Sequence, residues 1–599
     1  MSEQECQAAH TQSGHRTAPL EQAQGRPGST VVAATRQGVC GEAEGVTDVA
    51  GGLRTHPGRG SAGTLPEQGL ARPGSGRRRS ARQHPDRRGR LSWRAVRQVG
   101  FRHPVSLGTA AAVVIVLSWA RAGPDAAVSD PTSWLGLLGP RDPRSPTRAA
   151  WELLLLAGLA ALALAWWQLQ RLAAHRKLSL RGAWVAGLLW FLPFAVGPPI
   201  GSRDVYAYAA QGELAARGID PTAVPVSALG PGRLLAAVDP LWQHSLPPYG
   251  GLAVAIERAA AVLAGGEAVG TVVVLRGLAL IAVLLATFVA VRLAAPGRRP
   301  LVLLLVLANP LVLIYLVSGA HLDAVAMALL IGGLLVARRS RPAGVMLCCL
   351  AATVKLPAIV GAVWLGMLGA HRAWSDPRTG RLLRTARGVA TDGVAAVAAL
   401  SVATVLGRGG VHWLGNLGTP GQGRTRIAVV ELVAAPITWL TGLAGRPLDE
   451  AAVLRTSRLL GEALAVAVVS WLLVRQVRRA PREPGRAEVG SPGLAWALVA
   501  AAALGPVVYP WYLALAVPLL ALGGARSRRW LCWGSLALSV TQLPPLRPFV
   551  ILLTGPSGVA VRAAMLAAAG ALALGMWMWA ARGDTGLRLR ALAGPERGA

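Results

Sequence analysis

Long apolar segments separated by short polar breaks recur through the chain after residue 98. Apolar runs of this length predict helices that cross a membrane. We expect full spans at 107–122, 149–171, 182–199, 268–295, 301–319, 323–337, 388–407, 459–474, 492–508, 511–523, 530–545 and 558–580. Half-length helices are expected at 343–355 and 357–370, and interfacial or re-entrant segments at 251–264 and 427–445. The predicted fold is an all-α polytopic membrane protein with about 12–14 transmembrane helices.

The first 98 residues have a different pattern, rich in Gly, Ser, Arg, Gln and Pro and almost without aliphatic runs. Such a segment cannot bury enough apolar surface to fold, so we expect a disordered basic tail. An arginine cluster between Arg77 and Arg90 precedes the first span, where it would hold this end in the cytoplasm and contact anionic lipid. The predicted organisation is a cytoplasmic tail (1–98), a membrane domain (99–585) with a large outer loop (200–267), and a second cytoplasmic tail (586–599).

Charge gives the predicted orientation. The formal net charge of +32 lies mostly in the tail and in short loops between apolar segments, as the positive-inside rule expects, so it does not indicate nucleic-acid binding. The less basic loops at 123–148, 200–267, 320–322, 408–458 and 546–557 then face outward, and both termini face the cytoplasm. This alternation requires the chain to turn back at Lys355–Pro357, because one continuous helix there would place the basic loop 371–387 outside.

Composition and motifs exclude several classes of function. The chain is 53% hydrophobic and 15% charged, which leaves no room for a large soluble domain after the tail. It has no Walker phosphate loop, no dinucleotide fingerprint and no His-Glu-x-x-His zinc motif, and its five cysteines have no metal-ligand spacing. An activated donor would therefore arrive through the membrane.

The outer loop at 200–267 contains the first candidate for chemistry. Asp204 follows Pro198–Pro199 at the outer end of a span, at the border between membrane and water. A carboxylate in this place could accept a proton from an incoming hydroxyl as a general base. The alternative is a helix cap, because Ser202 and Asp204 both precede a helix-like segment.

Aromatic residues favour an outer cavity that binds sugar rings. The chain has six tyrosines, all outside or in the outer part of a span in the predicted topology: Tyr206, Tyr208, Tyr249, Tyr315, Tyr509 and Tyr512. An aromatic belt would use both interfaces, whereas one-sided clustering is typical of a shared cavity. Aromatic faces and hydroxyls suit sugars, and Trp242, Trp413 and Trp511 could join them.

Further ionisable residues occur at the same predicted membrane face. His321 and Asp323 lie at an outer span end, where such groups are costly and often functional, although structural hydrogen bonding is an equal alternative. Lys355 lies at the predicted turn between half-helices, where it could neutralise a phosphate or extend its amine to the interface.

Nine short motifs occur in order between about residues 100 and 580: Ser-Arg-Asp-Val-Tyr-Ala-Tyr-Ala-Ala-Gln-Gly (202–212), Gly-Ile-Asp-Pro (218–221), Val-Asp-Pro-Leu-Trp (238–242), Pro-Tyr-Gly (248–250), Ala-Asn-Pro-Leu (308–311), Gly-Ala-His-Leu-Asp-Ala (319–324), Val-Lys-Leu-Pro-Ala (354–358), Thr-Pro-Gly (419–421) and Gly-Pro-Val-Val-Tyr-Pro-Trp-Tyr-Leu (505–513). Together these motifs resemble the actinobacterial polyprenol-phosphate-mannose-dependent alpha-1,6-mannosyltransferases. The family pattern often has Asn where this chain has Leu322.

The resemblance implies a GT-C type fold with an outward-facing active site and an essential aspartate, matched by Asp204. It implies a polyprenyl-phosphate-mannose donor and a mannan or phosphatidylinositol-mannoside-type glycolipid acceptor of lipomannan and lipoarabinomannan synthesis. We expect Arg203, Lys355 and His321 to bind the donor phosphate. The predicted sugar-binding residues are Tyr206, Tyr208, Trp242, Tyr249, Asp323, Tyr509, Trp511 and Tyr512.

No metal is required on principle, because phosphate leaves readily as an anion, but a divalent cation between Asp204 and the phosphate stays open as an alternative. Other lipid-phosphate sugars, such as glucose or arabinofuranose, and a protein acceptor are alternatives within the same chemistry. A lipid-linked sugar transporter and an inactive glycolipid-binding scaffold are alternatives from other classes.

Overall fold

The computed structural model describes residues 89–122, 148–423, 425, 427–480 and 492–541 of the 599-residue chain. Most of the predicted N-terminal tail, the span expected at 558–580 and the predicted C-terminal tail lie outside these residues. The first helix, α1, begins at Gly89 and therefore includes the last ten residues of the predicted tail.

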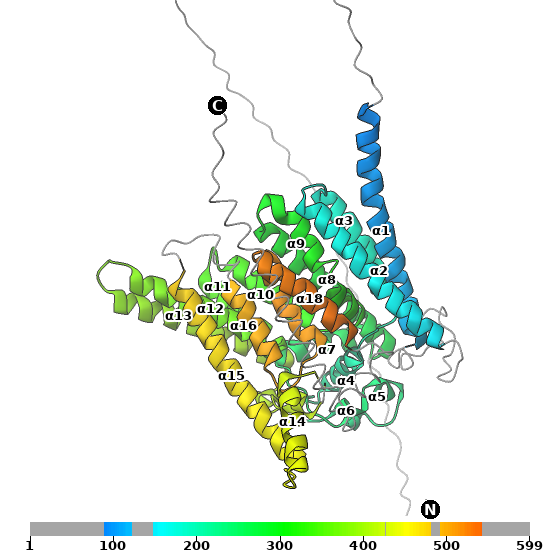
Figure 1. The fold of residues 1–599 in the computed structure, drawn as a ribbon. Coiled ribbons are helices and arrows are strands. Elements are labelled where there is room, and N and C mark those ends of the chain that lie inside the picture. The colour runs from blue at the N-terminus through cyan, green and yellow to red at the C-terminus, as the bar shows by residue number, and fades with distance from the viewer. Residues whose placement is uncertain (1–88, 123–147, 424, 426, 481–491, 542–599) are drawn as a thin grey trace, which may run out of the picture. The chain divides into compact units, whose positions relative to one another are not determined.

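The described part of the chain is built from helices and contains no strand (Figure 1). The α-helices are α1 (Gly89–Ala122), α2 (Arg148–Ala174), α3 (Leu180–Val196), α4 (Asp204–Ala216), α5 (Arg233–Ala237), α6 (Pro240–Gln243), α7 (Gly251–Leu263), α8 (Ala268–Leu293), α9 (Arg299–Val306), α10 (Asp323–Val336), α11 (Arg341–Val354), α12 (Ile359–Ser375), α13 (Arg381–Gly407), α14 (Val429–Leu443), α15 (Glu450–Arg478), α16 (Pro492–Ala503), α17 (Val517–Leu522) and α18 (Ala525–Val540). Shorter turns are the π-helix η4 (Val312–Ser318) and the 3-10 helices η2 (Val226–Leu229), η3 (Pro296–Arg298), η5 (Leu356–Ala358), η6 (His412–Leu414), η7 (Thr419–Gln422) and η9 (Pro510–Ala516).

Length and apolar composition make several of these helices candidate membrane spans. Within the described residues, six helices are long and apolar enough to cross a bilayer, and η4 with α10 forms a further candidate, bent by 106°. Five more apolar helices are shorter. These helices confirm the prediction of an all-α polytopic membrane protein.

The expected span at 301–319 is interrupted at Asn309–Pro310. The Asn309 side-chain amide donates to the Leu305 carbonyl (3.1 Å) and accepts from the Leu311 N–H (3.0 Å). These local bonds replace helical ones, and Pro310 has no N–H to donate. The segment is therefore α9 followed by η4, and not one straight helix as predicted.

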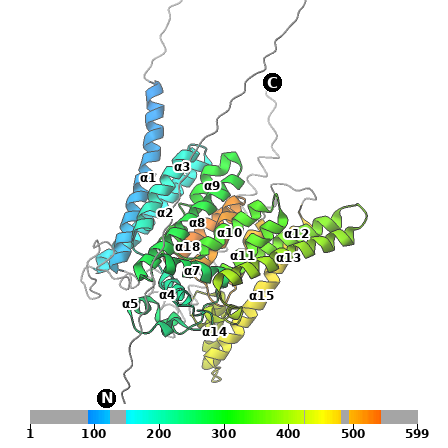
Figure 2. The same ribbon diagram turned by 180° about the vertical axis from the view of Figure 1, so that it is seen from behind.

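The expected break at Lys355 is confirmed. Lys355 has an extended backbone (φ −143°, ψ 109°) between α11 and α12. A side chain added at Gly361 would meet Cys348, and one added at Gly369 would meet Arg341. Since residues on either side of the break approach each other in antiparallel order, α11 and α12 form a helical hairpin (Figure 2).

Glycine contacts fix the position of α4. A Cβ atom at Gly212 would lie 2.3 Å from the backbone oxygen of Glu257 on α7, so only glycine permits this approach. Between α7 and α13, a Cβ atom at Gly251 would lie 2.2 Å from the backbone oxygen of Ala403 on α13. The Gly250 N–H also donates to the Thr353 carbonyl at 2.8 Å. These contacts connect α4 through α7 to the helix end that carries Lys355.

Candidate functional site

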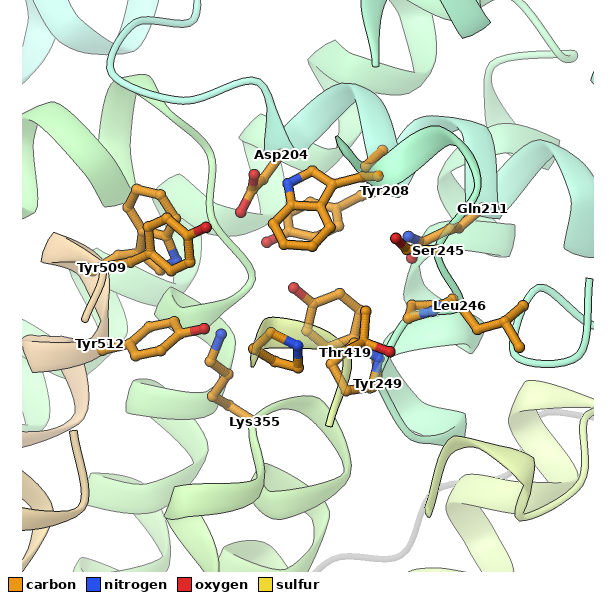
Figure 3. Close-up of a pocket in the computed structure, with 16 residues that line it drawn as sticks. Asp204, Tyr208, Gln211, Ser245, Leu246, Tyr249, Lys355, Thr419, Tyr509 and Tyr512 are labelled. Carbon is orange, nitrogen blue, oxygen red and sulfur yellow. The ribbon is translucent and has the colours of Figure 1, made fainter. Parts of the chain in front are cut away.

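A partly open cavity lies between α4, α6 with the loop after it, the break between α11 and η5, the short helix η7 and the segment around η9 (Figure 3). Eight of the predicted site residues line it: Asp204, Tyr208, Trp242, Tyr249, Lys355, Tyr509, Trp511 and Tyr512. They come from four separate parts of the sequence, and the fold brings them to one place.

Helix α4 contributes one of its faces to the cavity. Asp204, Ala207, Tyr208 and Gln211 all line it, at spacings of three, four and seven residues. These spacings place side chains on the same side of an α-helix. Asp204 lies in the first turn, where its N–H donates to the Ser202 hydroxyl at 3.1 Å and the helix dipole favours a negative charge.

The Asp204 carboxylate is held among buried groups. Its Oδ2 lies 3.6 Å from the His321 Nδ1, and the Tyr208 hydroxyl lies 3.4 Å from the same nitrogen. Burial raises the pKa of Asp204 from 3.8 to about 7, although the positive charge of Lys355 opposes the rise. A carboxyl group with a pKa near 7 can accept and release protons at neutral pH, as a general base must.

His321 and Asp323 lie behind the cavity wall. His321 is fully buried and stacks on Trp511, with ring centroids 4.0 Å apart and an interplanar angle of 25°. Asp323 is 2% exposed and pairs with Lys355 (Oδ1 to Nζ, 3.5 Å). Neither residue lines the cavity. His321 contacts the lining residues Asp204 and Trp511, and Asp323 contacts the lining residue Lys355.

The Lys355 ammonium is surrounded by aromatic rings as well as by Asp323. Its Nζ lies 4.3 Å from the centroid of the Tyr512 ring and 5.6 Å from that of Tyr249. Aromatic faces attract cations, and an ammonium has three N–H donors. Since Lys355 itself lines the cavity, its charge is available to an anion bound there.

Aromatic rings form much of the remaining wall. Tyr509 and Trp511 stack in parallel, with centroids 4.8 Å apart and an interplanar angle of 9°, and Tyr512 meets Tyr509 edge-on at 5.5 Å. On the other side, Tyr208 and Tyr249 meet edge-on at 5.7 Å. This combination of rings and hydroxyls is suited to a sugar.

The other aromatic candidates lie outside the lining. Tyr206 is 5% exposed and Trp413 is also 5% exposed, and neither lines the cavity. Tyr315 packs behind Trp511, with centroids 5.6 Å apart. Of these three residues, Tyr315 contacts the cavity wall through Trp511, and sugar binding by Tyr206 stays a prediction.

Arg203 is hydrogen-bonded to the backbone at the end of α5. Its guanidinium donates to the carbonyls of Ala236 (2.8 Å), Ala237 (2.9 Å) and Val238 (2.9 Å), at the end of α5. Free carbonyls at a helix end attract a cation, which explains this arrangement. Arg203 is not among the residues that line the cavity, and its binding of the donor phosphate stays a prediction.

The lining residues that were not among the predicted site residues are Ala207, Gln211, Ser245, Leu246, Pro247, Pro248, Thr419 and Pro420. Gln211 could have been found, because it follows Asp204 by seven residues on the same helix face. Ser245 and Thr419 come from loops with no helical spacing to Asp204. The Ser245 hydroxyl donates to the Gln422 side chain at 2.6 Å and so joins these two loops.

No three His, Cys, Asp or Glu side chains converge on a possible metal site within the described ranges. The alternative of a divalent ion between Asp204 and a phosphate would need ligand atoms from the substrate.

Comparison with known proteins agrees with the resemblance. The model of the family described as "Alpha-(1->6)-mannopyranosyltransferase, N-terminal domain" matches residues 105–371. An alpha-(1->6)-mannopyranosyltransferase of Mycobacterium tuberculosis is 30% identical over 478 residues, which cover 70% of this chain and 78% of the relative. A probable alpha-(1->6)-mannopyranosyltransferase of Mycolicibacterium smegmatis is 30% identical over 455 residues, with the same coverage of 70% and 78%. Alpha-(1->6)-mannopyranosyltransferase A of Corynebacterium glutamicum is 29% identical over 359 residues, covering 57% of this chain and 70% of the relative.

No solved structure matches the chain. The curated relatives are named as transferases of one sugar and one linkage, and the first of them meets this chain over most of its length. The chain therefore belongs to the alpha-(1->6)-mannopyranosyltransferase family and is a polytopic membrane glycosyltransferase.

Proposed function

We propose that this enzyme transfers mannose from polyprenol-phosphate mannose to a growing alpha-1,6-mannan of lipomannan or lipoarabinomannan, on the outer face of the plasma membrane. The names of its relatives support the sugar and the linkage. One structural observation carries the mechanism: Asp204 and Lys355 line the same cavity, between aromatic walls suited to a sugar.

The proposed reaction is a direct displacement at the anomeric carbon. The acceptor hydroxyl oxygen forms a bond to that carbon while the bond from carbon to the phosphate oxygen breaks. Asp204 takes the hydroxyl proton, and polyprenyl phosphate leaves with the electron pair of the broken bond. The Lys355 ammonium stabilises the negative charge of the leaving phosphate.

His321 is proposed to position Asp204 and not to bind phosphate directly. It contacts the carboxylate from behind and is fully buried beneath Trp511. Asp323 similarly positions the Lys355 ammonium. Both pairs place a catalytic group in the cavity and fix it from the protein interior.

The proposed outer location follows from charge. The cavity is bordered by α4, α6 and the segment before α14, while α3 and α9 begin at the opposite end of the helices (Figures 1 and 2). Arg176, Lys177, Arg298 and Arg299 lie at or next to those starts. Basic loops favour the cytoplasm, which supports an outward-facing cavity.

Transfer can be tested with membranes that contain the full-length chain. They are incubated with radiolabelled polyprenyl-phosphate mannose and a short alpha-1,6-mannoside, and the linkage formed is mapped. We expect alpha-1,6 transfer that Asp204→Asn abolishes and that a matched change on the same helix, Glu213→Gln, preserves. Full activity of Asp204→Asn would exclude this residue as the base.

Further arms of the same assay separate the alternatives. Transfer from a glucosyl or arabinofuranosyl lipid, with none from the mannosyl lipid, would replace the proposed sugar. Loss of transfer in EDTA, restored by magnesium, would support a divalent ion. Movement of intact lipid-linked sugar across reconstituted vesicles, without transfer, would favour a transporter.

The orientation has its own test. In a cysteine-free background, we expect Arg233→Cys on α5 to react with a membrane-impermeant maleimide in intact cells. Arg339→Cys, in the basic loop after α10, should react only after permeabilisation. The reverse pattern would place the cavity in the cytoplasm and refute the proposed location.

A further inference from the structure

Gln211 is a buried polar residue that the mechanism above does not use. It is 6% exposed, lines the cavity, and its side-chain oxygen has no hydrogen-bond partner within the described residues. A buried amide oxygen without a partner is costly, and native structures rarely leave one without a reason. The side chain lies at the cavity, so a bound molecule could supply the missing donor (Figure 3).

The surroundings of Gln211 are uncharged and combine polar side chains with the apolar Leu246 (Figure 3). Ser245 and Thr419 line the same cavity, and Figure 3 shows Ser245 beside Gln211, whereas Lys355 and Tyr512 lie together at the other end. The Ser245 hydroxyl has its donor directed to Leu241 (2.8 Å) or Gln422 (2.6 Å), which leaves its lone pairs as acceptors. The amide, two hydroxyls and nearby aromatic rings suit a neutral sugar, because sugar hydroxyls both donate and accept hydrogen bonds.

The position along α4 indicates which sugar is bound. Gln211 follows Asp204 by seven residues, which corresponds to about 10 Å along a helix. In the proposed mechanism the acceptor hydroxyl must approach Asp204, while the donor phosphate approaches Lys355. A sugar that contacts Asp204 at one end and extends along α4 is therefore the acceptor.

We infer that Gln211, Ser245 and Thr419 form the subsite for the terminal mannose of the acceptor, with the Gln211 amide bonded to one of its hydroxyls. This inference rests on the proposed function, because it assigns the roles of Asp204 and Lys355 from that mechanism. It predicts that this end of the cavity selects a neutral hexose and makes no contact with the donor phosphate.

The test uses the full-length enzyme in detergent and an octyl alpha-1,6-dimannoside as acceptor probe. Gln211→Leu keeps a similar side-chain volume and removes both hydrogen-bonding groups; Glu213→Gln on the same helix is the matched control. We expect Gln211→Leu to raise the KM and the equilibrium Kd of the dimannoside about tenfold, with the KM of the mannosyl lipid changed less than twofold. Gln211→Asn, which keeps the amide on a shorter stem, should recover part of the loss.

Deoxy analogues of the dimannoside identify the contact. One analogue should bind the wild type several-fold more weakly than the parent does, yet bind Gln211→Leu as well as the parent does. Equal losses in both proteins for every analogue, or a rise in the donor KM alone, would overturn the inference. The wild type could also bind the dimannoside in a way that depends on Gln211 and yet transfer no mannose. That result would reject the proposed function and retain the sugar-binding subsite.

Discussion

The pKa of Asp204 predicts how transfer depends on pH. A base with a pKa of about 7 is ionised in roughly one tenth of the molecules at pH 6, half at pH 7 and nine tenths at pH 8. Since only the ionised form can accept the acceptor proton, kcat/KM should fall about tenfold between pH 8 and pH 6. The proposed phosphodiester donor and neutral acceptor have no group that titrates in this range, so the change is expected to come from the enzyme.

Removal of Lys355 provides the matched perturbation. Its positive charge lowers the pKa of Asp204, so Lys355→Gln should move the profile to higher pH, in addition to slowing transfer through loss of the proposed phosphate contact. The assay is kcat/KM for radiolabelled mannosyl lipid between pH 5.5 and 9, at saturating acceptor. A flat wild-type profile between pH 6 and pH 8, or an acid shift in Lys355→Gln, would refute the reasoning.

The same pKa makes a prediction about stability. Because the folded-state pKa of Asp204 is raised above its ordinary value of 3.8, the stability that its neutral form provides is present at low pH and lost as pH rises from about 4 to about 7. Asp204→Asn stays neutral and avoids this loss, which is at most on the order of 4 kcal/mol above pH 7. Thermal unfolding in detergent should show Asp204→Asn more stable than the wild type at pH 8, by a margin that narrows at pH 5. A wild type that is more stable than Asp204→Asn at pH 8 would contradict the buried environment assigned to this carboxyl.

Three further substitutions test the surrounding framework. Gly212→Ala should force α4 away from the Glu257 backbone and reduce both thermal stability and transfer. Gly393→Ala is the control, because a Cβ atom at Gly393 would have no neighbouring atom within 4 Å; it should leave both unchanged or raise stability slightly. Arg276→Met should lower the unfolding temperature and transfer together, because the Arg276 guanidinium donates to backbone carbonyls of the two segments that precede Asp204 and His321; unchanged transfer would exclude this linking role. Arg458→Met should raise the acceptor KM several-fold, because Arg458 donates to loop carbonyls on either side of Gln422. An effect on the donor KM alone would assign the loop to the donor.

Membrane spans were predictable because a helix that crosses a bilayer must be apolar over a known length. The break at Asn309–Pro310 was not predicted, although both residues can interrupt a helix, because the apolar residues on either side favour one span over 301–319. Arg203 illustrates a second limit of prediction from the sequence. Its sequence position beside Asp204 favoured a shared role, but the guanidinium extends to carbonyls that the chain places there more than thirty residues later.

The position of Lys355 shows how a global requirement can predict a local feature. No residue in the segment 343–370 shows by itself that the helix must break at the lysine, and an isolated Pro357 would also fit a kinked continuous span. The break followed from the arginines beyond it, which must stay on one side of the membrane. In the structure, the broken end carries Lys355 to Asp323, which begins α10 directly after another interruption. Two irregular segments thus meet beside Asp204 and bring Lys355 and Asp323 to it. The irregular backbone and the chemistry are therefore parts of one arrangement: the same interruptions that break the apolar helices also bring the charged groups of the proposed reaction together.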